Sequence, residues 1–280
     1  MSRTRPVFRN SLIVAAICIA VTVIATQAAV LQPAAGQQGG AGRGGPQGPP
    51  PTARAAAPFD LSGYWVSVVT EDWRWRMVTP QKGDYASVPL NQAGRQLADT
   101  WDLAKDKANH DECKAYGAAG LIRIPMMLHI TWQDDSTLKI ETDAGEQTKL
   151  LHFGGSSRQA GERTWQGFSV AEWYKQPQQA GLGGGGGGRG FAGGNLKVVT
   201  TNMKAGYLRK NGVPYSEDAV LTEYFNRHDE PNGDQWITVT SVIEDPKYLN
   251  QPFLLSTSFM KEVDASKWRP TPCEIAPPRE

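Results

Sequence analysis

Residues 207–261 decide the fold, and they read YLRKNGVPYSEDAVLTEYFNRHDEPNGDQWITVTSVIEDPKYLNQPFLLSTSFMK. The alternation of apolar and polar residues predicts three strands, at about 219–227, 235–243 and 252–260. Asn232-Gly233 favours a hairpin turn between the first two strands, and Asp245-Pro246 breaks the chain before the third. We therefore expect a block of antiparallel sheet here.

Glu223 is the candidate functional residue within this stretch. It alternates with Leu221 and Phe225, so a sheet face that buries these two side chains also buries Glu223. A buried carboxylate either has a raised pKa or is paired with a cation, and Arg227 is the nearest cation along the strand. Glu223 is therefore a candidate general acid or base, with a structural Glu223–Arg227 ion pair at a barrel mouth as the alternative.

The first 28 residues have the pattern of a secretory signal peptide. Arginines precede a continuous apolar stretch from Ser11 to Ala25, and small residues follow it. The stretch is shorter than the ~20 residues that a membrane-spanning helix needs. We expect cleavage of residues 1–28, export to a periplasmic or extracellular space, and no membrane span in the mature chain. A retained N-terminal anchor is the alternative.

Charge and cysteine content narrow the classes of partner. Removal of residues 1–28 takes away three arginines, which leaves 26 basic residues (29 − 3) against 28 acidic residues. The chain lacks the basic stripe of a nucleic-acid-binding protein, so we expect no nucleic-acid partner. Two cysteines remain, Cys113 and Cys273, and an even pair in an oxidising compartment predicts a disulfide.

Composition separates a linker from a folded domain. Residues 29–57 are rich in Ala, Gly, Gln and Pro and are expected to be disordered, which leaves 58–280 as the folded part. A glycine-rich insertion at 176–195 has no strand-to-helix context for a phosphate loop, and we expect a flexible connection there.

The folded part is mainly β. Further strands are predicted at 59–70, 73–78, 129–133, 137–143, 147–153, 164–174 and 195–202. One amphipathic helix is predicted over 90–108, with Asn91 as its N-cap. About ten short strands without alternating helices predict a single antiparallel barrel-like domain of the lipocalin or calycin type, with a sandwich as the alternative.

Three of the predicted strands form a meander whose registers follow from loops of three residues. The expected pairs are Ile130 with Ile140, Trp132 with Leu138, and Ile140 with Leu150. The opposite face then carries His129, Glu141 and Lys149 as a row of alternating charge, which is typical of a solvated sheet face.

Two resemblances support a secreted β domain. At Gly63-Tyr64-Trp65 the chain resembles lipocalin-type barrels, whose first strand carries the pattern glycine-any-tryptophan. Further motifs lie between Cys113 and Lys261. They are Trp165-Gln-Gly167-Phe-Ser169 with Trp173, Leu196-Lys-Val-Val-Thr200, Gly212-Val-Pro214-Tyr-Ser216, Thr222-Glu223 with Arg227, Glu244-Asp245-Pro246, and Pro252-Phe253.

With these motifs the chain resembles a large, functionally uncharacterised family of secreted bacterial β-rich proteins. It departs from that family at Tyr174, where the glycine insertion interrupts the join to the next strand, and at Phe253, where the family tends to have tryptophan. The resemblance implies a secreted β domain and brings no activity with it.

The tryptophans suggest what such a barrel binds. All nine follow residue 58, and four fall on strands whose inward face would line a cavity: Trp65, Trp132, Trp165 and Trp173. Together with Arg227 they are the candidate binding residues for a small apolar or aromatic molecule.

Two other classes of function remain open. An exported enzyme would use Glu223 as general acid or base, helped by His129 or Tyr224, and a surface interaction domain is the further alternative. The four histidines lack the spacing of metal ligands and there is no CxxC motif, so we expect no metal and no cofactor.

Overall fold

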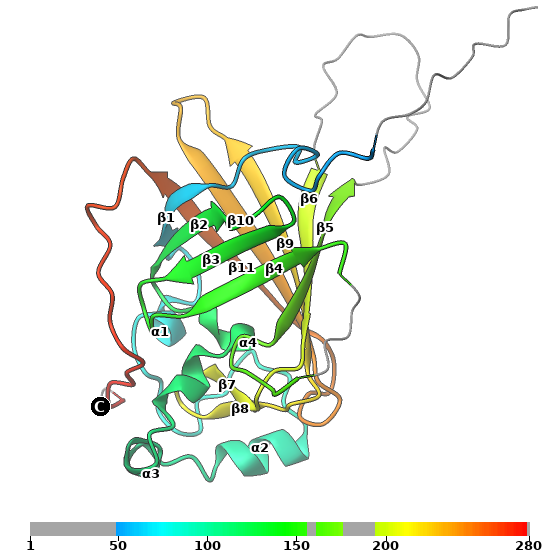
Figure 1. Cartoon of the computed structure of the whole chain (residues 1–280). Coiled ribbons are helices and arrows are strands. Elements are labelled where there is room, and N and C mark those ends of the chain that lie inside the picture. Colours follow the sequence, from blue (N-terminus) through cyan, green and yellow to red (C-terminus); the bar gives the residue numbers. More distant parts are fainter. Residues whose placement is uncertain (1–48, 156–160, 176–193, 279–280) are drawn as a thin grey trace, which may run out of the picture. The chain divides into compact units, whose positions relative to one another are not determined.

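The computed structural model describes residues 49–155, 161–175 and 194–278 (Figure 1). The expected signal peptide at 1–28, the linker up to residue 48 and the insertion at 176–193 lie outside these residues. Nine of the eleven strands described form a closed barrel, in the order β1-β11-β10-β9-β6-β5-β4-β3-β2. The prediction of a mainly β, barrel-like domain is confirmed.

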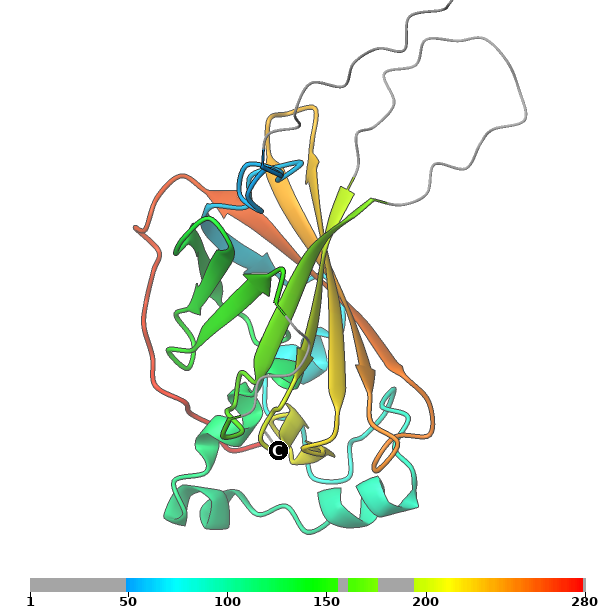
Figure 2. The same cartoon turned by 45° about the vertical axis from the view of Figure 1, so that its right-hand side comes forward.

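The barrel strands are β1 (Gly63–Val68), β2 (Met127–Trp132), β3 (Thr137–Thr142), β4 (Thr148–Phe153), β5 (Phe168–Lys175), β6 (Gly194–Thr201), β9 (Val220–Asp229), β10 (Gln235–Glu244) and β11 (Phe253–Glu262). A separate two-stranded sheet consists of β7 (Gly206–Arg209) and β8 (Val213–Tyr215). The helices are α1 (Trp73–Arg76), α2 (Gln92–Ala98), α3 (Leu103–Ala108), the 3₁₀ helix η1 (Glu112–Tyr116) and α4 (Ala118–Leu121). These helices, β7 and β8 gather at one end of the barrel, while the β9–β10 turn lies at the other end (Figure 2). We call the end of the barrel that carries the helices, β7 and β8 the helix end.

The last three strands lie where the alternation predicts them, within two residues. Gly233 has a φ of 92° in the β9–β10 turn, where glycine meets no steric cost. β9 pairs antiparallel with β10, and β10 with β11. The positions of β9, β10 and β11 thus follow from the alternation and the turn residues of this stretch itself.

One pair of strands departs from the antiparallel pattern. β4 and β5 are parallel, with Leu151 opposite Ser169 and Phe153 opposite Ala171. Parallel neighbours cannot be joined by a tight hairpin, so the chain after β4 returns to the helix end before β5 begins. This pair closes an otherwise antiparallel barrel.

The helical part differs from the sequence prediction. Asn91 caps α2 as expected, because its Oδ1 accepts from Gly94 N at 2.9 Å, but the predicted helix over 90–108 is broken after Ala98. Asp102 is extended and its side chain caps a second helix, α3, by accepting from Ala104 N at 2.9 Å. A second N-cap in mid-sequence competes with helix continuation.

Residues 73–78, expected as a strand, contain the short helix α1 instead. Trp75 N and Arg76 N both donate to the backbone oxygen of Asp72, which starts the helical turn. Arg76 then points inward, where Nη1 pairs with Glu71 and Nε donates to Arg123 O at 2.9 Å. The charged partners of Arg76 override the alternating pattern of this segment.

The register of the third meander strand is shifted by one residue from the prediction. Ile130 pairs with Ile140 as expected, but Ile140 faces Lys149 and not Leu150. The turn has an extra residue because Asp143 leaves the strand. Its Oδ1 accepts from Met127 N at 2.8 Å and from Ala144 N at 2.7 Å. Since side chains alternate across a strand, the shift turns Lys149 from the outer face into the barrel.

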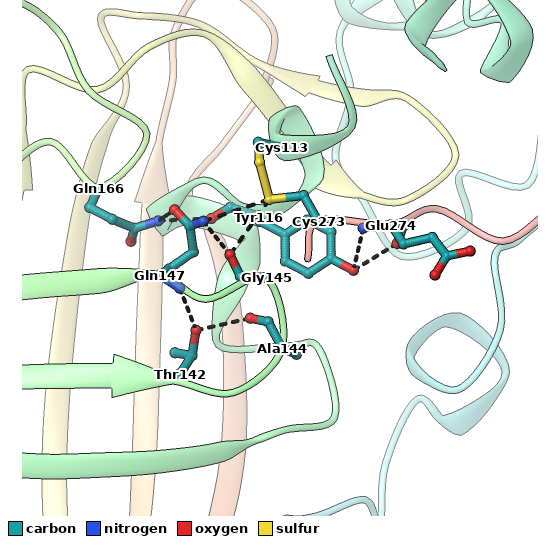
Figure 3. Close-up of a disulfide and its surroundings, with 9 residues drawn as sticks. All are labelled: Cys113, Tyr116, Thr142, Ala144, Gly145, Gln147, Gln166, Cys273 and Glu274. Atoms are coloured by element: carbon teal, nitrogen blue, oxygen red, sulfur yellow. Dashed lines mark hydrogen bonds between the residues drawn. A yellow bond between two sulfur atoms is a disulfide. The ribbon is translucent and has the colours of Figure 1, made fainter. Parts of the chain in front are cut away.

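The predicted disulfide joins Cys113 to Cys273, with Cα atoms 5.1 Å apart (Figure 3). It ties η1 to the C-terminal tail. Beside it, the Tyr116 hydroxyl donates to Glu274 O at 2.7 Å and accepts from Glu274 N. Gly145 has a φ of 77°, and a Cβ there would lie 2.2 Å from the Tyr116 ring, so only glycine fits beneath it.

The barrel interior is filled with large apolar side chains. Eleven side chains of the main core cluster that lie on barrel strands are at most 1% exposed: Trp65, Leu128, Ile130, Leu138, Leu151, Leu196, Val198, Phe225, Ile237, Val239 and Phe259. They come from β1, β2, β3, β4, β6, β9, β10 and β11, so one core joins most of the barrel wall. No helix within the described residues is both long and apolar enough to cross a membrane.

Candidate functional site

The end of the barrel opposite the helices is crossed by residues 52–60, which we call the strap (Figure 1). Three hydrogen bonds attach it: Arg54 N to Asp135 O at 3.1 Å, Trp173 Nε1 to Ala53 O at 2.8 Å, and Arg227 Nη1 to Asp60 O at 3.0 Å. The strap includes residues expected to belong to the disordered linker. Within residues 52–57, Ala53 O and Arg54 N have partners on the barrel rim, so the structure holds this part of the expected linker against the barrel.

Four aromatic rings meet where the strap crosses the barrel, one from the strap and three from barrel strands, and we call them the aromatic mouth: Phe59, Trp132, Phe153 and Trp173. Trp173 lies at the centre, with ring centroids 5.5 Å from Phe59, 5.2 Å from Phe153 and 6.5 Å from Trp132. Trp132 and Phe153 are 5.5 Å apart. These separations lie in the range of favourable aromatic pairs.

The sequence alternation explains why these rings point inward. Trp132, Phe153 and Trp173 continue the inward series of Ile130, Leu151 and Ala171 on β2, β4 and β5. Each lies on its strand at the end opposite the helices, and each is only partly buried. The barrel therefore ends in an aromatic rim above a filled apolar interior.

A cavity of about 290 Å³ opens beside this rim. Its walls are Trp132 of the rim and the strap and adjoining residues Arg54, Ala57, Phe59, Asp60 and Ser62. Trp132 and Phe59 thus give the cavity an aromatic side, and Arg54, Asp60 and Ser62 give it polar groups. Such a combination suits a small ligand that stacks on a ring and bonds to a few polar groups.

Asp60 fixes the turn that leads from the strap into β1. Its Oδ1 accepts from Ser62 N at 2.8 Å. Although burial acts in the opposite direction, the Ser62 N–H and hydroxyl and the charges of Lys261 and Arg227 lower the pKa of Asp60. The mouth therefore holds an ionised carboxylate at neutral pH.

The predicted binding residues are only partly brought together. Trp132 and Trp173 belong to the aromatic mouth. Arg227 is connected to the mouth only by the hydrogen bond from its Nη1 to Asp60 O of the strap. Trp65 is fully buried in the core, where Nε1 donates to Leu61 O at 2.8 Å and Lys261 lies over the ring. Trp165 precedes β5 near the helix end, with its backbone oxygen bonded to Ala118 N and its ring under Lys204.

Glu223 is buried, as its alternation predicts, with 2% of its surface exposed. Its partner is Lys149 of β4, not Arg227. Arg227 lies farther along β9, where its guanidinium bonds to Asp229 at 3.0 Å and to the strap. Because Lys149 turns inward with the shifted register, it reaches Glu223 across the barrel. Neither Lys149 nor Glu223 lines the cavity at the mouth.

His129 and Tyr224 lie apart from Glu223. His129 pairs with Glu141 across β2 and β3, with Nδ1 3.3 Å from Oε2, as the predicted charge row requires. Lys139 continues that row in place of Lys149, at 3.0 Å from Glu141. Tyr224 alternates with Glu223 and so takes the other face of β9, where its ring packs against Tyr174.

The described residues contain no group of three or more His, Cys, Asp or Glu side chains placed to hold a metal ion. Comparison with protein-family models and with curated proteins finds no match to the chain. The structure adds Phe59 and Phe153 to the residues singled out from the sequence, and it moves Lys149 from the predicted outer charge row into the barrel. Phe153 and Lys149 alternate with Leu151, and the correct register of β4 would have identified both.

Proposed function

We propose that the protein binds a small apolar or aromatic molecule at the aromatic mouth. The observation that carries this proposal is the juxtaposition of four partly buried rings with a cavity of about 290 Å³. Aromatic faces gain energy from a stacked or edge-on partner ring beyond simple burial. The strap, held by hydrogen bonds at three points, is the element that has to move for a ligand to enter fully.

The size of the cavity limits the ligand. Ligand sites commonly enclose roughly 300–1,000 Å³, and the mouth cavity lies at the lower bound. The large side chains below the mouth, such as Leu151 and Phe225, leave less than 2% of their surface exposed. A ligand of one or two fused rings fits these dimensions better than a long acyl chain.

Export is part of the same proposal. The N-terminal pattern of residues 1–28 and the resemblance to secreted bacterial β-rich proteins both favour a periplasmic or extracellular protein. The Cys113–Cys273 disulfide supports that location, because disulfides persist in oxidising compartments.

A fluorescence titration with N-phenyl-1-naphthylamine tests the proposal, since this neutral dye brightens in apolar sites. We expect saturable binding to the wild-type protein and about tenfold weaker binding to Trp132→Ala, which corresponds to ~1.4 kcal/mol. Trp165→Ala is the matched control, because Trp165 lies near the helix end. Equal loss in both variants, or no saturable binding at all, contradicts the proposal.

A further inference from the structure

A second cleft lies at the helix end of the barrel and is lined by four cations. Arg76 comes from α1, Arg123 from the turn after α4, and Arg209 and Lys210 from the end of β7. The remaining walls are mostly apolar: Trp75, Ala115, Gly120, Ile124, Leu208, Phe253 and Leu255. We call this the basic cleft. It shares no lining residue with the cavity at the mouth.

Two of the cations are compensated by nearby carboxylates. Arg76 Nη1 lies 2.5 Å from Glu71 Oε1, and Arg123 contacts Glu71 at 3.2 Å and Asp72 at 2.6 Å. Two carboxylates thus neutralise two guanidinium groups. The arrangement holds these guanidiniums rigidly at the wall of the cleft.

The other two cations have no such partner in the described part of the chain. Arg209 and Lys210 form no ion pair with a carboxylate there. They contact aromatic rings instead: Arg209 Cζ lies 4.5 Å from the Trp75 centroid, and Lys210 Nζ lies 5.9 Å from that of Tyr116. Rings orient a cation but do not neutralise its charge. Arg209 and Lys210 are thus the two cations of the cleft without a carboxylate in direct contact. Asp72 and Asp84 attract Arg209, and Glu274 attracts Lys210, only from beyond ion-pair distance.

Two buried guanidinium nitrogens of the cleft also lack a hydrogen-bond acceptor. Arg76 is 3% exposed, and its Nη2 is buried without an acceptor, as is Nη1 of Arg209. Burial lowers the pKa of Arg209 to about 10, so Arg209 is still a cation at neutral pH, and burial also lowers the pKa of Lys210. Buried cationic donors without acceptors are costly, and such groups normally have a partner.

We propose that the basic cleft binds the anionic group of a small organic molecule, a carboxylate or a phosphate monoester. Guanidinium groups match both anions by paired N–H donation, and Lys210 adds a point charge. The enclosed space is about 30 Å³, which takes the anionic group but not a whole molecule. The apolar body of the ligand then lies against Phe253 and Leu255 at the rim of the barrel.

Calorimetric titration with benzoate, phenyl phosphate and benzamide tests this inference. Benzamide has the shape of benzoate without its charge. We expect at least one of the two anions to bind with about tenfold or greater preference over benzamide. Raised salt should weaken the binding, because the interaction is between charges. The stronger of the two anions identifies the preferred head group.

Matched variants locate the binding. Arg209→Gln combined with Lys210→Gln should lower the affinity for the anion at least tenfold, while Lys82→Gln, which removes an exposed cation elsewhere, should not. Near-ultraviolet circular dichroism and binding of N-phenyl-1-naphthylamine at the mouth should stay unchanged, which separates this site from the proposed function. Equal affinity for benzoate, phenyl phosphate and benzamide overturns the inference. Unchanged anion affinity in the double variant does the same.

Discussion

Lys149 on β4 and Glu223 on β9 form an ion pair across the interior of the barrel. Their side chains are 8% and 3% exposed, so water screens the pair little. Two strands, β5 and β6, lie between β4 and β9 around the barrel wall. The pair therefore links two strands that are not neighbours in the sheet, and each charge depends on the other for compensation.

Removal of one partner should destabilise the protein strongly. Glu223→Gln leaves Lys149 as a buried cation without its counter-charge, and we expect a loss of about 3–5 kcal/mol in the free energy of unfolding. Urea denaturation of the two proteins measures the difference. The double variant Lys149→Met, Glu223→Leu removes both charges and should recover most of the stability. A single variant as stable as the wild type would show that the pair is not structural.

The same variant addresses the acid–base alternative for Glu223. If the residue only holds the barrel together, Glu223→Gln lowers stability without changing the affinity for N-phenyl-1-naphthylamine at temperatures where the variant is folded. A large loss of a measured turnover, at unchanged stability, would instead support general acid–base chemistry.

Loss of the disulfide should be costly as well. Cys113 and Cys273 are 160 residues apart in sequence, and the chain-entropy model gives an upper value of about 5 kcal/mol for closing so long a loop. We expect Cys113→Ala with Cys273→Ala to lower the melting temperature and to free the C-terminal tail for proteolysis. Identical melting of the wild type and the double variant would show that the tail is held by other contacts alone.

The strap should loosen when its bond to β5 is removed. Trp173→Phe keeps an aromatic ring in the mouth but deletes the Nε1 donor to Ala53 O. We expect faster cleavage between residues 52 and 60 in limited proteolysis and faster association of N-phenyl-1-naphthylamine. Trp165→Phe is the control, and equal cleavage in both variants would contradict a role for this bond.

Acid should weaken the turn that follows the strap. Because the pKa of folded Asp60 lies below its ordinary value of 3.8, its stabilising effect is complete above that pH and is lost as the pH falls through the folded pKa. The stability difference between the wild type and Asp60→Asn should therefore be constant near neutral pH and shrink in acid. A difference that grows as the pH falls would reverse the sign and contradict the assignment.

Local patterns predicted the parts of the fold that depend on neighbouring residues. Asn232-Gly233 marked the β9–β10 turn, and alternation placed Ile130 opposite Ile140 and buried Glu223. These features need only the period of a strand and the chemistry of a turn, both of which are visible in a few consecutive residues.

The missed features depend on distant parts of the chain. Asp143 leaves β3 to bond to Met127 N and to contact the C-terminal tail at Thr271, and this decides the direction of Lys149. The residues of the basic cleft come from α1, the turn after α4 and β7, so no short motif contains them. Such sites become visible only when the fold brings the segments together.

The position of a bound ligand tests the central claim most directly. Intermolecular nuclear Overhauser effects can be measured between N-phenyl-1-naphthylamine and the aromatic side-chain protons of the protein. We expect contacts with Trp132, Phe59 and Trp173 and none with Phe253 at the helix end. Contacts confined to the helix end, with none at the aromatic mouth, would contradict the account.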